Sequence, residues 1–564
     1  MHEILSQIGS NPWSLFIGAF SLLLLWGATR ALEWAWLKPR RFEQAMRKQG
    51  LCGTVYRSLA GDLKEIIRLN KEARAKPMQF SHDISPRISP FQYRTIKQFG
   101  KLSFTWFGPY PRITVMDSGL VREILSNKFG HFEKEKFSRL GQLLAAGLAN
   151  YGGEKWAKHR RILNPAFQVE KLKRMLPAFS ICCSELVDRW ENSVGTDESF
   201  ELDVWPEMQN LTGDVISKAA FGSSYHEGRR IFQLQTEQVE RFTKAVPTLF
   251  IPFNWNNIRV SKGKKNEKAK GGDNYASLFL VPCLSLRLGT GTYQLKIIKM
   301  MKQTAREVQT LLMGILAKRE NAIRNGETTE DDLLGLLLES NKSEMEQNGT
   351  SDSSLGLTID EVIEECKLFY FAGQETTSVL LTWTLVVLSI HPEWQEKARE
   401  EVLQHFGRDK PDFDGLSRLK IVSMILYEVL RLYPPVVALS RRTYKTTQLG
   451  DVTVPPGVHL HLPILFIHHD PDIWGPDATE FKPTRFAEGI SKATKNGQSA
   501  FFPFGWGPRI CIGQNFALLE AKLGLSMILQ HFRFELSENY QHAPQIVIFT
   551  VHPQHGAPIK FHRL

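Results

Sequence analysis

The first long apolar run of the chain lies at its N-terminus. No charged residue stands between Ile4 and Thr29, and a tryptophan marks each end of the apolar core Trp13–Trp26. This run reaches the roughly 20 residues that a membrane-spanning helix needs, and tryptophan is favoured at the headgroup layer. A cleaved signal peptide is the alternative, but a basic start and a small-residue cleavage site before Arg30 are both lacking. We therefore predict a membrane anchor over residues 1–35.

The charges on the two sides of this anchor are unequal. Glu3 precedes it, whereas basic residues follow it at Arg30, Lys38, Arg40 and Arg41. Basic residues collect on the cytosolic side of a membrane, so the chain downstream of the anchor is expected in the cytosol. Pro39 is expected to end the helix and to separate the anchor from the globular part.

The longest helical pattern runs from Ile359 to about Ile390. Its apolar second half, Val379–Ile390, is too short to cross a bilayer, and Gln374 and Glu375 interrupt the longer apolar run. A buried central helix is therefore predicted. A glycine inside a helix costs about 1 kcal/mol relative to alanine, and threonines there can bond the carbonyl one turn back. The stretch 372–377, Ala-Gly-Gln-Glu-Thr-Thr, thus indicates a local defect with something fitted against the backbone.

A small sheet is predicted near the start of the globular part. Two β-type runs, Leu102–Phe107 and Arg112–Met116, flank the turn sequence Gly-Pro-Tyr-Pro at 108–111.

Two polar segments interrupt these patterns. Residues 260–294 open with a Lys/Gly-rich stretch, and a compact domain rarely needs so long an unpatterned loop. Our hypothesis is an insertion, specifically a retained intron, whose removal would join Arg259 to Leu295; comparing transcript with genomic sequence tests it. Residues 341–356 are predicted to form a mobile surface loop.

Composition narrows the function classes. The chain has 564 residues, which is enough for a large buried core. Its net charge of +11 is compatible with binding to anionic lipid or to an acidic protein partner. The basic residues are scattered and no nucleic-acid-binding motif accompanies them, which makes nucleic acid the weakest option. The six cysteines show no disulfide-like spacing, as in a reducing compartment. The pairs His468/His469 and His552/His555 lack the spacing of a closed metal site, so solvated or core histidine is favoured.

One cysteine lies in a loop made stiff by glycine and proline. The sequence from Phe504 to Gly513 is Phe-Gly-Trp-Gly-Pro-Arg-Ile-Cys-Ile-Gly, with Cys511 just before a helical pattern that begins near Asn515. Such a turn at a helix N-terminus is expected to lower the pKa of the thiol and to direct backbone N–H groups at the sulfur. Taken alone, a buried unreactive cysteine is the commoner alternative.

Other motifs in the chain favour a haem-binding cysteine over an unreactive one. The pattern F-x-x-G-x-R-x-C-x-G resembles the haem-binding signature of the cytochrome P-450 superfamily, and the stretches 153–167, 371–378 and 501–517 are most similar to the plant family that includes secologanin synthase, family 72 of the plant cytochromes P-450. The resemblance covers the chain from Trp36 to its end, apart from 260–294. It implies a mainly α fold with small β-sheets, the cytochrome P-450 fold, as one haem-thiolate catalytic domain over 36–564 behind the transmembrane helix.

The resemblance also implies which residues bind the cofactor, haem b. Cys511 would be the axial ligand of the iron, with Phe504 packed beneath the porphyrin and Gly513 closing the loop. The haem propionates would be bound by residues from three places in the chain: Trp156 and Arg160, Arg441, and Arg509.

For catalysis and for the fold around the cysteine loop the resemblance implies five further residues. Thr376 would hydrogen-bond dioxygen at the iron, and Glu375 would help relay protons to it. Glu428, Arg431 and Arg485 would form a buried charge network behind the cysteine loop. Most relatives carry an acidic residue where this chain has Thr484, which puts part of the surrounding hydrogen bonding in question.

The activity implied is hydroxylation of a hydrophobic small molecule, of a plant terpenoid class such as iridoids, triterpenoids or gibberellins. Dioxygen and electrons from NADPH, delivered by a cytochrome P-450 reductase, would drive it at the endoplasmic reticulum membrane. Apolar candidate pocket walls are the loop 140–148, Phe371 with Ala372, residues 436–439 and residues 549–551. A reductase-independent haem-thiolate isomerase and a non-catalytic membrane-anchored scaffold are the alternatives. The intact cysteine loop and Thr376 argue against the isomerase.

Overall fold

The computed structural model describes residues 12–57, 59–127, 130–195, 198–222, 225–249, 288–326, 332–347, 356–495, 497 and 499–564. The helices are α2 (Pro12–Leu32), α3 (Lys38–Lys48), α4 (Leu63–Ala75), α5 (Ser85–Ile88), α6 (Pro90–Phe99), α7 (Ser118–Ser126), α8 (Arg139–Leu144), α9 (Gly153–Leu163), α10 (Val169–Glu191), α11 (Val204–Phe221), α12 (Tyr225–Leu249), α13 (Leu288–Arg324), α14 (Leu333–Gln347), α15 (Ile359–Ile390), α16 (Pro392–Phe406), α17 (Phe413–Arg418), α18 (Ile421–Leu432), α19 (Ile464–His468), α20 (Pro471–Trp474) and α21 (Gln514–His531). The strands are β1 (Leu102–Phe107), β2 (Tyr110–Val115), β3 (Phe132–Glu133), β4 (Ser199–Asp203), β5 (Leu439–Thr443), β6 (Thr447–Leu449), β7 (Val452–Val454), β8 (His459–Leu462), β9 (Phe532–Leu536), β10 (Pro544–Val547), β11 (Thr550–Pro553) and β12 (Pro558–Arg563). The prediction of a mainly α fold with small sheets is confirmed.

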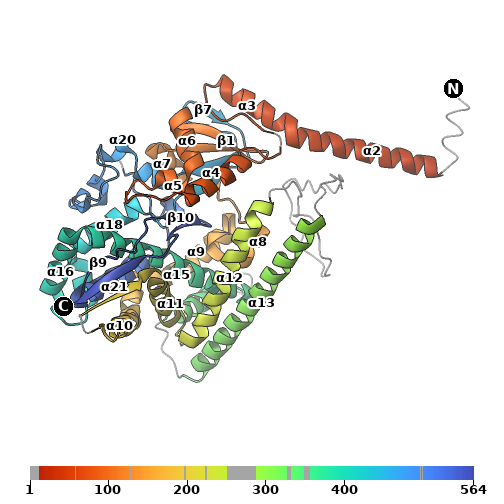
Figure 1. Ribbon diagram of the computed structural model, residues 1–564. Helices are drawn as coiled ribbons and strands as arrows, with labels where there is room; N and C mark the ends of the chain where they lie inside the picture. The colour runs from red at the N-terminus through yellow and green to blue at the C-terminus, as the bar shows by residue number, and fades with distance from the viewer. Residues whose placement is uncertain are drawn as a thin grey trace, which may run out of the picture.

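The N-terminal helix projects from the globular body as a long rod (Figure 1). α2 continues through a π-helical turn, Glu33–Leu37, into α3. Within the described part of the chain, Leu15–Lys48 is the one helix long and apolar enough to cross a membrane. The prediction that Pro39 ends this helix is wrong. Pro39 takes the second position of α3, directly after the wider π-helical turn, where its ring and missing N–H are tolerated.

The predicted central helix is confirmed as α15. Thr358 and Glu361 form a capping box at its start, which satisfies two backbone N–H groups that the helix leaves unpaired. α15 packs against α11, α18 and α21, and most of its side chains from Val362 to Leu388 are buried. The helix therefore lies at the centre of the helical layer, which occupies the lower part of the view in Figure 1.

A five-stranded sheet of order β1-β2-β8-β5-β3 forms the second part of the body, beside α4 and α6 (Figure 1). β1 has the predicted bounds, but β2 begins at Tyr110, inside the predicted turn 108–111, so Phe107 faces Tyr110 across a connection of only two residues. β10 and β11 form a separate hairpin, and an isolated bridge joins Thr550 of β11 to Val436. β11 also contacts α15, where the indole of Trp383 donates to Val551 O at 2.8 Å.

The polar segments differ in part from their predictions. α14 extends to Gln347, so the first seven residues of the predicted loop 341–356 are helical. α13 begins at Leu288, within the predicted insertion 260–294. Residues 348–355 and 260–287 lie outside the described part of the chain. The predicted loop 140–148 is also mostly helical, because α8 and a 3-10 turn at Gly147–Ala149 occupy it.

Three buried histidines lie close together where the sheet region meets the helices. His82 Nδ1 is 2.9 Å from Tyr433 Oη, His469 Nε2 donates to Leu432 O at 3.0 Å, and His542 contacts both Tyr540 and Ser81. Burial lowers the pKa of His82 and His469 to about 3 and of His542 to about 4, and nearby cations add to the effect. These histidines are therefore neutral in the folded protein near neutral pH.

This arrangement predicts that the protein loses stability on acidification. Because the three pKa values lie below the ordinary value of 6.5, the unfolded chain binds more protons than the folded chain below about pH 6.5. Each histidine should reduce the free energy of unfolding by on the order of 1 kcal/mol per pH unit between about pH 6.5 and 4. Denaturant unfolding followed by tryptophan fluorescence at several pH values measures the slope. His82→Asn should flatten it, whereas the same change at the exposed His405 should not.

Candidate active site

Two glycines with left-handed backbone shape the cysteine loop. Gly505 has φ +79° and Gly507 has φ +71°. A Cβ on Gly507 would lie 2.8 Å from Leu125 O, so only glycine fits this close approach. The loop closes when the N–H of Cys511 donates to Phe504 O at 2.9 Å, and α21 begins three residues later with Gly513 at its N-cap. The fold thus holds Cys511 at a helix start, as the sequence predicts.

The thiol of Cys511 does not ionise as easily as we expected. Burial raises its pKa, and the Gly513 N–H group and the positive charge of Arg160 offset only part of that increase. The residue nevertheless keeps accessible surface, so a ligand can reach it. Since a bound metal ion deprotonates a coordinating thiol outright, the raised pKa is compatible with Cys511 as a metal ligand.

Cationic side chains gather close to this cysteine. Arg160 donates to Ile510 O at 2.8 Å, and Arg509 donates to Tyr151 O at 2.9 Å while its guanidinium lies 4.3 Å from the Trp156 ring centre. Arg441 of β5 donates to Ser440 O at 2.8 Å. Burial, and then repulsion from the neighbouring arginine, lower the pKa values of Arg441 and Arg509 to about 10. The structure therefore brings together all four predicted propionate-binding residues.

Lys134 is a fifth member of this cluster that the sequence did not reveal. It donates to Ala149 O, and burial together with Arg441 and Arg509 lowers its pKa to about 7. It belongs to the sequence Glu-Lys-Glu-Lys at 133–136, and such an alternation of charges is typical of a solvent-exposed segment. The negative charge of Glu135 opposes the lowering of the Arg441 pKa, but the Glu135 carboxylate also contacts His459 Nδ1 at 2.6 Å. Arg441 is buried and the other cations are half-buried. Cations that repel one another in such surroundings favour an anionic ligand, and the two carboxylates of a haem fit them.

Thr376 and Glu375 lie on α15. Thr376 Oγ1 donates to Ala372 O at 2.8 Å, the contact one turn back that the sequence predicts. Glu375 accepts from Thr550 Oγ1 at 2.6 Å and contacts His552 Nε2 at 2.5 Å. The glycine of this stretch has a different purpose from the one expected: a Cβ on Gly373 would lie 2.8 Å from the Ile216 side chain, so Gly373 lets α11 approach.

Three of the predicted pocket walls lie together near Phe371 of α15. The ring of Phe549, at the tip of the β10–β11 hairpin, lies 5.9 Å from that of Phe371 on α15. The bridge between Val436 and Thr550 brings the segment 436–439 to the same place. About three turns before Thr376, the N–H of Leu148 donates to Glu365 of α15 at 2.9 Å. The hairpin and the segment 436–439 therefore lie near Phe371, whereas the segment 140–148 contacts α15 closer to its N-terminus.

The predicted charge network is compact and buried. Arg431 binds both carboxylate oxygens of Glu428, at 2.8 and 2.7 Å, and both side chains have no exposed surface. Arg485 Nε lies 3.4 Å from Glu428 Oε1. The acid that is missing at Thr484 has a counterpart in Asp477, whose carboxylate lies 2.8 Å from Arg485. Sequence alone could not find Asp477, because the loop that carries it has no regular pattern.

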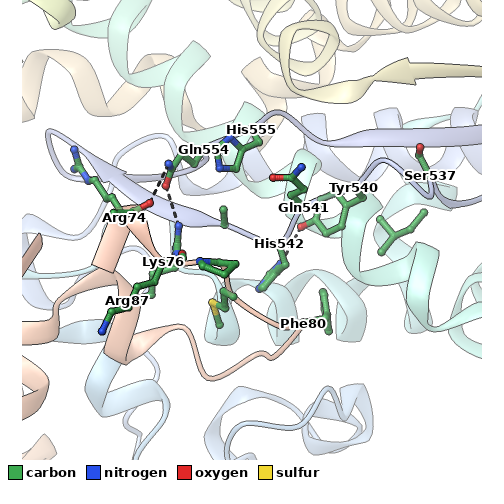
Figure 2. A pocket seen from close by; sticks show the side chains of 15 residues that line it. Arg74, Lys76, Phe80, Arg87, Ser537, Tyr540, Gln541, His542, Gln554 and His555 are labelled. Atoms are coloured by element: carbon green, nitrogen blue, oxygen red, sulfur yellow. Dashed lines mark hydrogen bonds between the residues drawn. The ribbon is translucent and has the colours of Figure 1, made fainter. Parts of the chain in front are cut away.

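A pocket of about 770 Å³ lies away from these residues, between the end of α4 and the base of the β10–β11 hairpin (Figure 2). Arg74, Lys76 and Arg87 line it together with His542 and Gln554. Arg87 donates to Pro544 O at 3.1 Å and to Gln554 Oε1 at 2.9 Å, which are the two ends of the hairpin. The pocket thus borders the hydrogen bonds by which Arg87 fixes the two ends of the hairpin.

Comparison with known proteins identifies the family. The cytochrome P450 family model matches residues 87–556. Cytochrome P450 CYP72A616 of Paris polyphylla is 58% identical over 98% of this chain and 100% of its own length. The chain belongs to the CYP72A family of plant cytochromes P450. Cytochrome P450 72A397 of Kalopanax septemlobus is 51% identical over 95% of both chains, and CYP72A219 of Panax ginseng is 49% identical over 96% of both.

The fold and the class of chemistry follow from this membership. A solved structure, retinoic acid-bound cyanobacterial CYP120A1, has a TM-score of 0.68 and covers 91% of this chain and 99% of its own, at 22% identity. The likeness shows that the chain has the cytochrome P450 fold. As a CYP72A protein it is a monooxygenase and hence an oxidoreductase, of a family that uses haem held by a cysteine thiolate.

Proposed function

We propose that this CYP72A enzyme hydroxylates a hydrophobic terpenoid, of iridoid, triterpenoid or gibberellin type, with dioxygen and electrons passed from NADPH by a cytochrome P450 reductase. The observation that supports it most directly is the pairing of Cys511 with the cation cluster. A reachable thiol, which a bound metal ion would deprotonate, lies beside partly buried cations that favour carboxylates.

The chain's own residues supply binding and orientation. Cys511 would hold the iron of haem b, while Trp156, Arg160, Arg441, Arg509 and Lys134 would hold its propionates and Phe504 would pack near the sulfur. When bound, the haem supplies the activation of dioxygen and the oxidation of a C–H bond. The charge network of Glu428, Arg431 and Arg485 would fix the position of the cysteine loop relative to the helices behind it.

Proton delivery falls to α15. The hydroxyl of Thr376 is held by Ala372 O, and the Glu375 carboxylate is held by the hairpin. An alcohol and a carboxylate at adjacent positions of a helix could orient a water molecule and hold a proton at the Thr376 hydroxyl. The walls formed by Phe371, Phe549 and Val436 are apolar, which suits a terpenoid and excludes water around it.

The substrate proposal is tested by titrating the ferric enzyme with terpenoids of the three classes. Binding that displaces water from the iron changes the spin state and therefore the absorption spectrum. Product formation that requires both NADPH and reductase supports the monooxygenase. Turnover of a peroxide without reductase would favour the isomerase, and an enzyme without any turnover across the panel would favour the scaffold.

Replacing Thr376 with alanine should keep haem binding but separate NADPH oxidation from product formation. Loss of the hydroxyl removes one proton donor, and such groups contribute about 10²- to 10⁴-fold to proton-transfer steps. We expect product per NADPH to fall about tenfold or more and peroxide to appear. The matched control is Thr384→Ala, since Thr384 makes the same contact one turn back, to Leu380 O at 2.7 Å. Equal coupling in both variants would remove Thr376 from the relay.

We also propose that the enzyme is a single-pass protein of the endoplasmic reticulum membrane with its catalytic domain in the cytosol. The exposed apolar helix over Leu15–Lys48 supports an anchor, and the basic residues after it support the orientation. The sequons at Asn210, Asn341 and Asn348 provide the test, because glycan on any of them would place the domain in the lumen.

A further inference from the structure

Glu375 is held by two side chains from the β10–β11 hairpin. Its Oε1 accepts from Thr550 Oγ1 at 2.6 Å and lies 2.5 Å from His552 Nε2. Thr550 Oγ1 and His552 Nε2 are themselves 3.0 Å apart, so three polar groups form one triangle. Both donors meet the same carboxylate oxygen, which leaves Oε2 outside the triangle.

The hairpin is fixed independently of this contact. At its base, Arg87 bonds Pro544 and Gln554, and Arg74 donates to Ile546 O at 2.6 Å; Figure 2 shows these side chains around the hairpin. On its inner side, the indole of Trp383 donates to Val551 O at 2.8 Å. Because these contacts come from two separate elements, α15 and the segment of α4 and α5, the positions of Thr550 and His552 do not depend on Glu375.

A third element covers the histidine. The ring of Trp205, at the start of α11, lies 4.5 Å from that of His552. Asp203 caps α11 by accepting from the backbone N–H of Trp205, so the backbone that carries this indole is fixed at a helix start. Ring packing thus restricts the rotation of His552 and directs its Nε2 at Glu375.

The effect on the carboxyl is to favour its ionised form. Burial alone raises the pKa of Glu375, but the hydrogen bond and the charge of His552, with the bond from Thr550, outweigh it and bring the pKa below its ordinary value. An oriented, ionised carboxylate one residue from Thr376 is the geometry that a proton relay needs.

We infer that His552 is a positioning residue for the monooxygenase reaction: with Thr550, it holds the Glu375 carboxylate in one orientation beside Thr376. The inference rests on the proposed function and adds to it a histidine from the C-terminal hairpin. It also assigns a role to a residue whose sequence pattern indicated only a core or solvated histidine.

The test compares two substitutions at one position. His552→Phe keeps a ring against Trp205 but removes the N–H donor, whereas His552→Gln keeps a donor. We expect His552→Phe to lower product per NADPH about tenfold, with a raised solvent isotope effect, and His552→Gln to recover most of the loss. His555→Phe is the control, because His555 is exposed and lines the pocket of Figure 2. Wild-type coupling in His552→Phe, or a His552→Gln variant as impaired as His552→Phe, would overturn the inference.

A second measurement does not depend on turnover. Thermal unfolding of the ferric protein is compared for wild type, His552→Phe, Glu375→Gln and the double variant. The two residues are in contact, so the combined loss in Tm should be smaller than the sum of the single losses, and strict additivity would contradict the contact. If the wild-type protein lacks the thiolate-type absorption band, the proposed function fails. If that band and normal coupling persist in His552→Phe, only the present inference fails.

Discussion

Replacing Cys511 with alanine should yield a protein without the absorption band that reduced, CO-treated haem-thiolate proteins show. Alanine offers no ligand to the iron, and no other cysteine that the structure describes lies in this loop. The remaining propionate contacts cannot substitute for a coordinate bond, so haem incorporation should fall to background. The absorption difference spectrum of the purified protein measures this directly.

The control for Cys511 is Cys52→Ala, because Cys52 is exposed and lies far from α21 in the chain. It should retain both haem and band. Circular dichroism of Cys511→Ala shows whether its helices persist, which separates loss of the ligand from loss of the fold. A thiolate-type band in Cys511→Ala would refute the assignment of the axial ligand.

Replacing Arg431 with leucine should prevent the enzyme from reaching a stable fold. Arg431 binds both oxygens of Glu428 and also donates to the carbonyls of His468, Ala478 and Glu480. Removing it leaves the fully buried Glu428 carboxylate with the N–H of Lys482 at 2.9 Å and the longer contact to Arg485 at 3.4 Å, and breaking a buried pair in this way costs about 3–5 kcal/mol. That is a large part of the 5–15 kcal/mol or so by which domains are stable.

Expression yield, haem content and thermal unfolding measure this loss. Arg431→Lys should not rescue it, since one ammonium cannot reproduce the planar set of donors that these acceptors bind. The matched control is Lys492→Ala, which breaks the exposed pair with Glu488 at 3.2 Å and should cost less than about 1 kcal/mol. A folded, haem-loaded Arg431→Leu protein would show that the network is dispensable.

Local patterns predicted the regular elements well where a single element carried its own signals. α15 has the predicted ends because a capping box starts it and His391-Pro392 follows it. β1 was predicted over its full length because a two-residue turn ends it. Signals of this kind act over a few residues, so they can be read without the rest of the fold.

Other elements depended on contacts from a distance. The helix continues through Pro39 because a π-helical turn precedes it, and Tyr56 donates to Ala35 O at 2.6 Å within that turn. α14 extends into the predicted loop, where the side chain of Asn341 bonds both backbone groups of Leu357 and Glu344 pairs with Arg161 of α9. Neither contact is visible in the polar composition of the segment.

The sequence by itself indicated the cysteine loop, Glu375 and Thr376 of α15, and the candidate propionate-binding arginines, because each belongs to a short motif whose residues are neighbours in the chain. Only the tertiary structure decided the net effect on the Cys511 thiol, the inclusion of Lys134 among the cations, and the pairing of Glu375 with His552 across 177 residues. Burial and electrostatic interaction depend on distances in space, and those distances exist only after the helices and the hairpin have packed together.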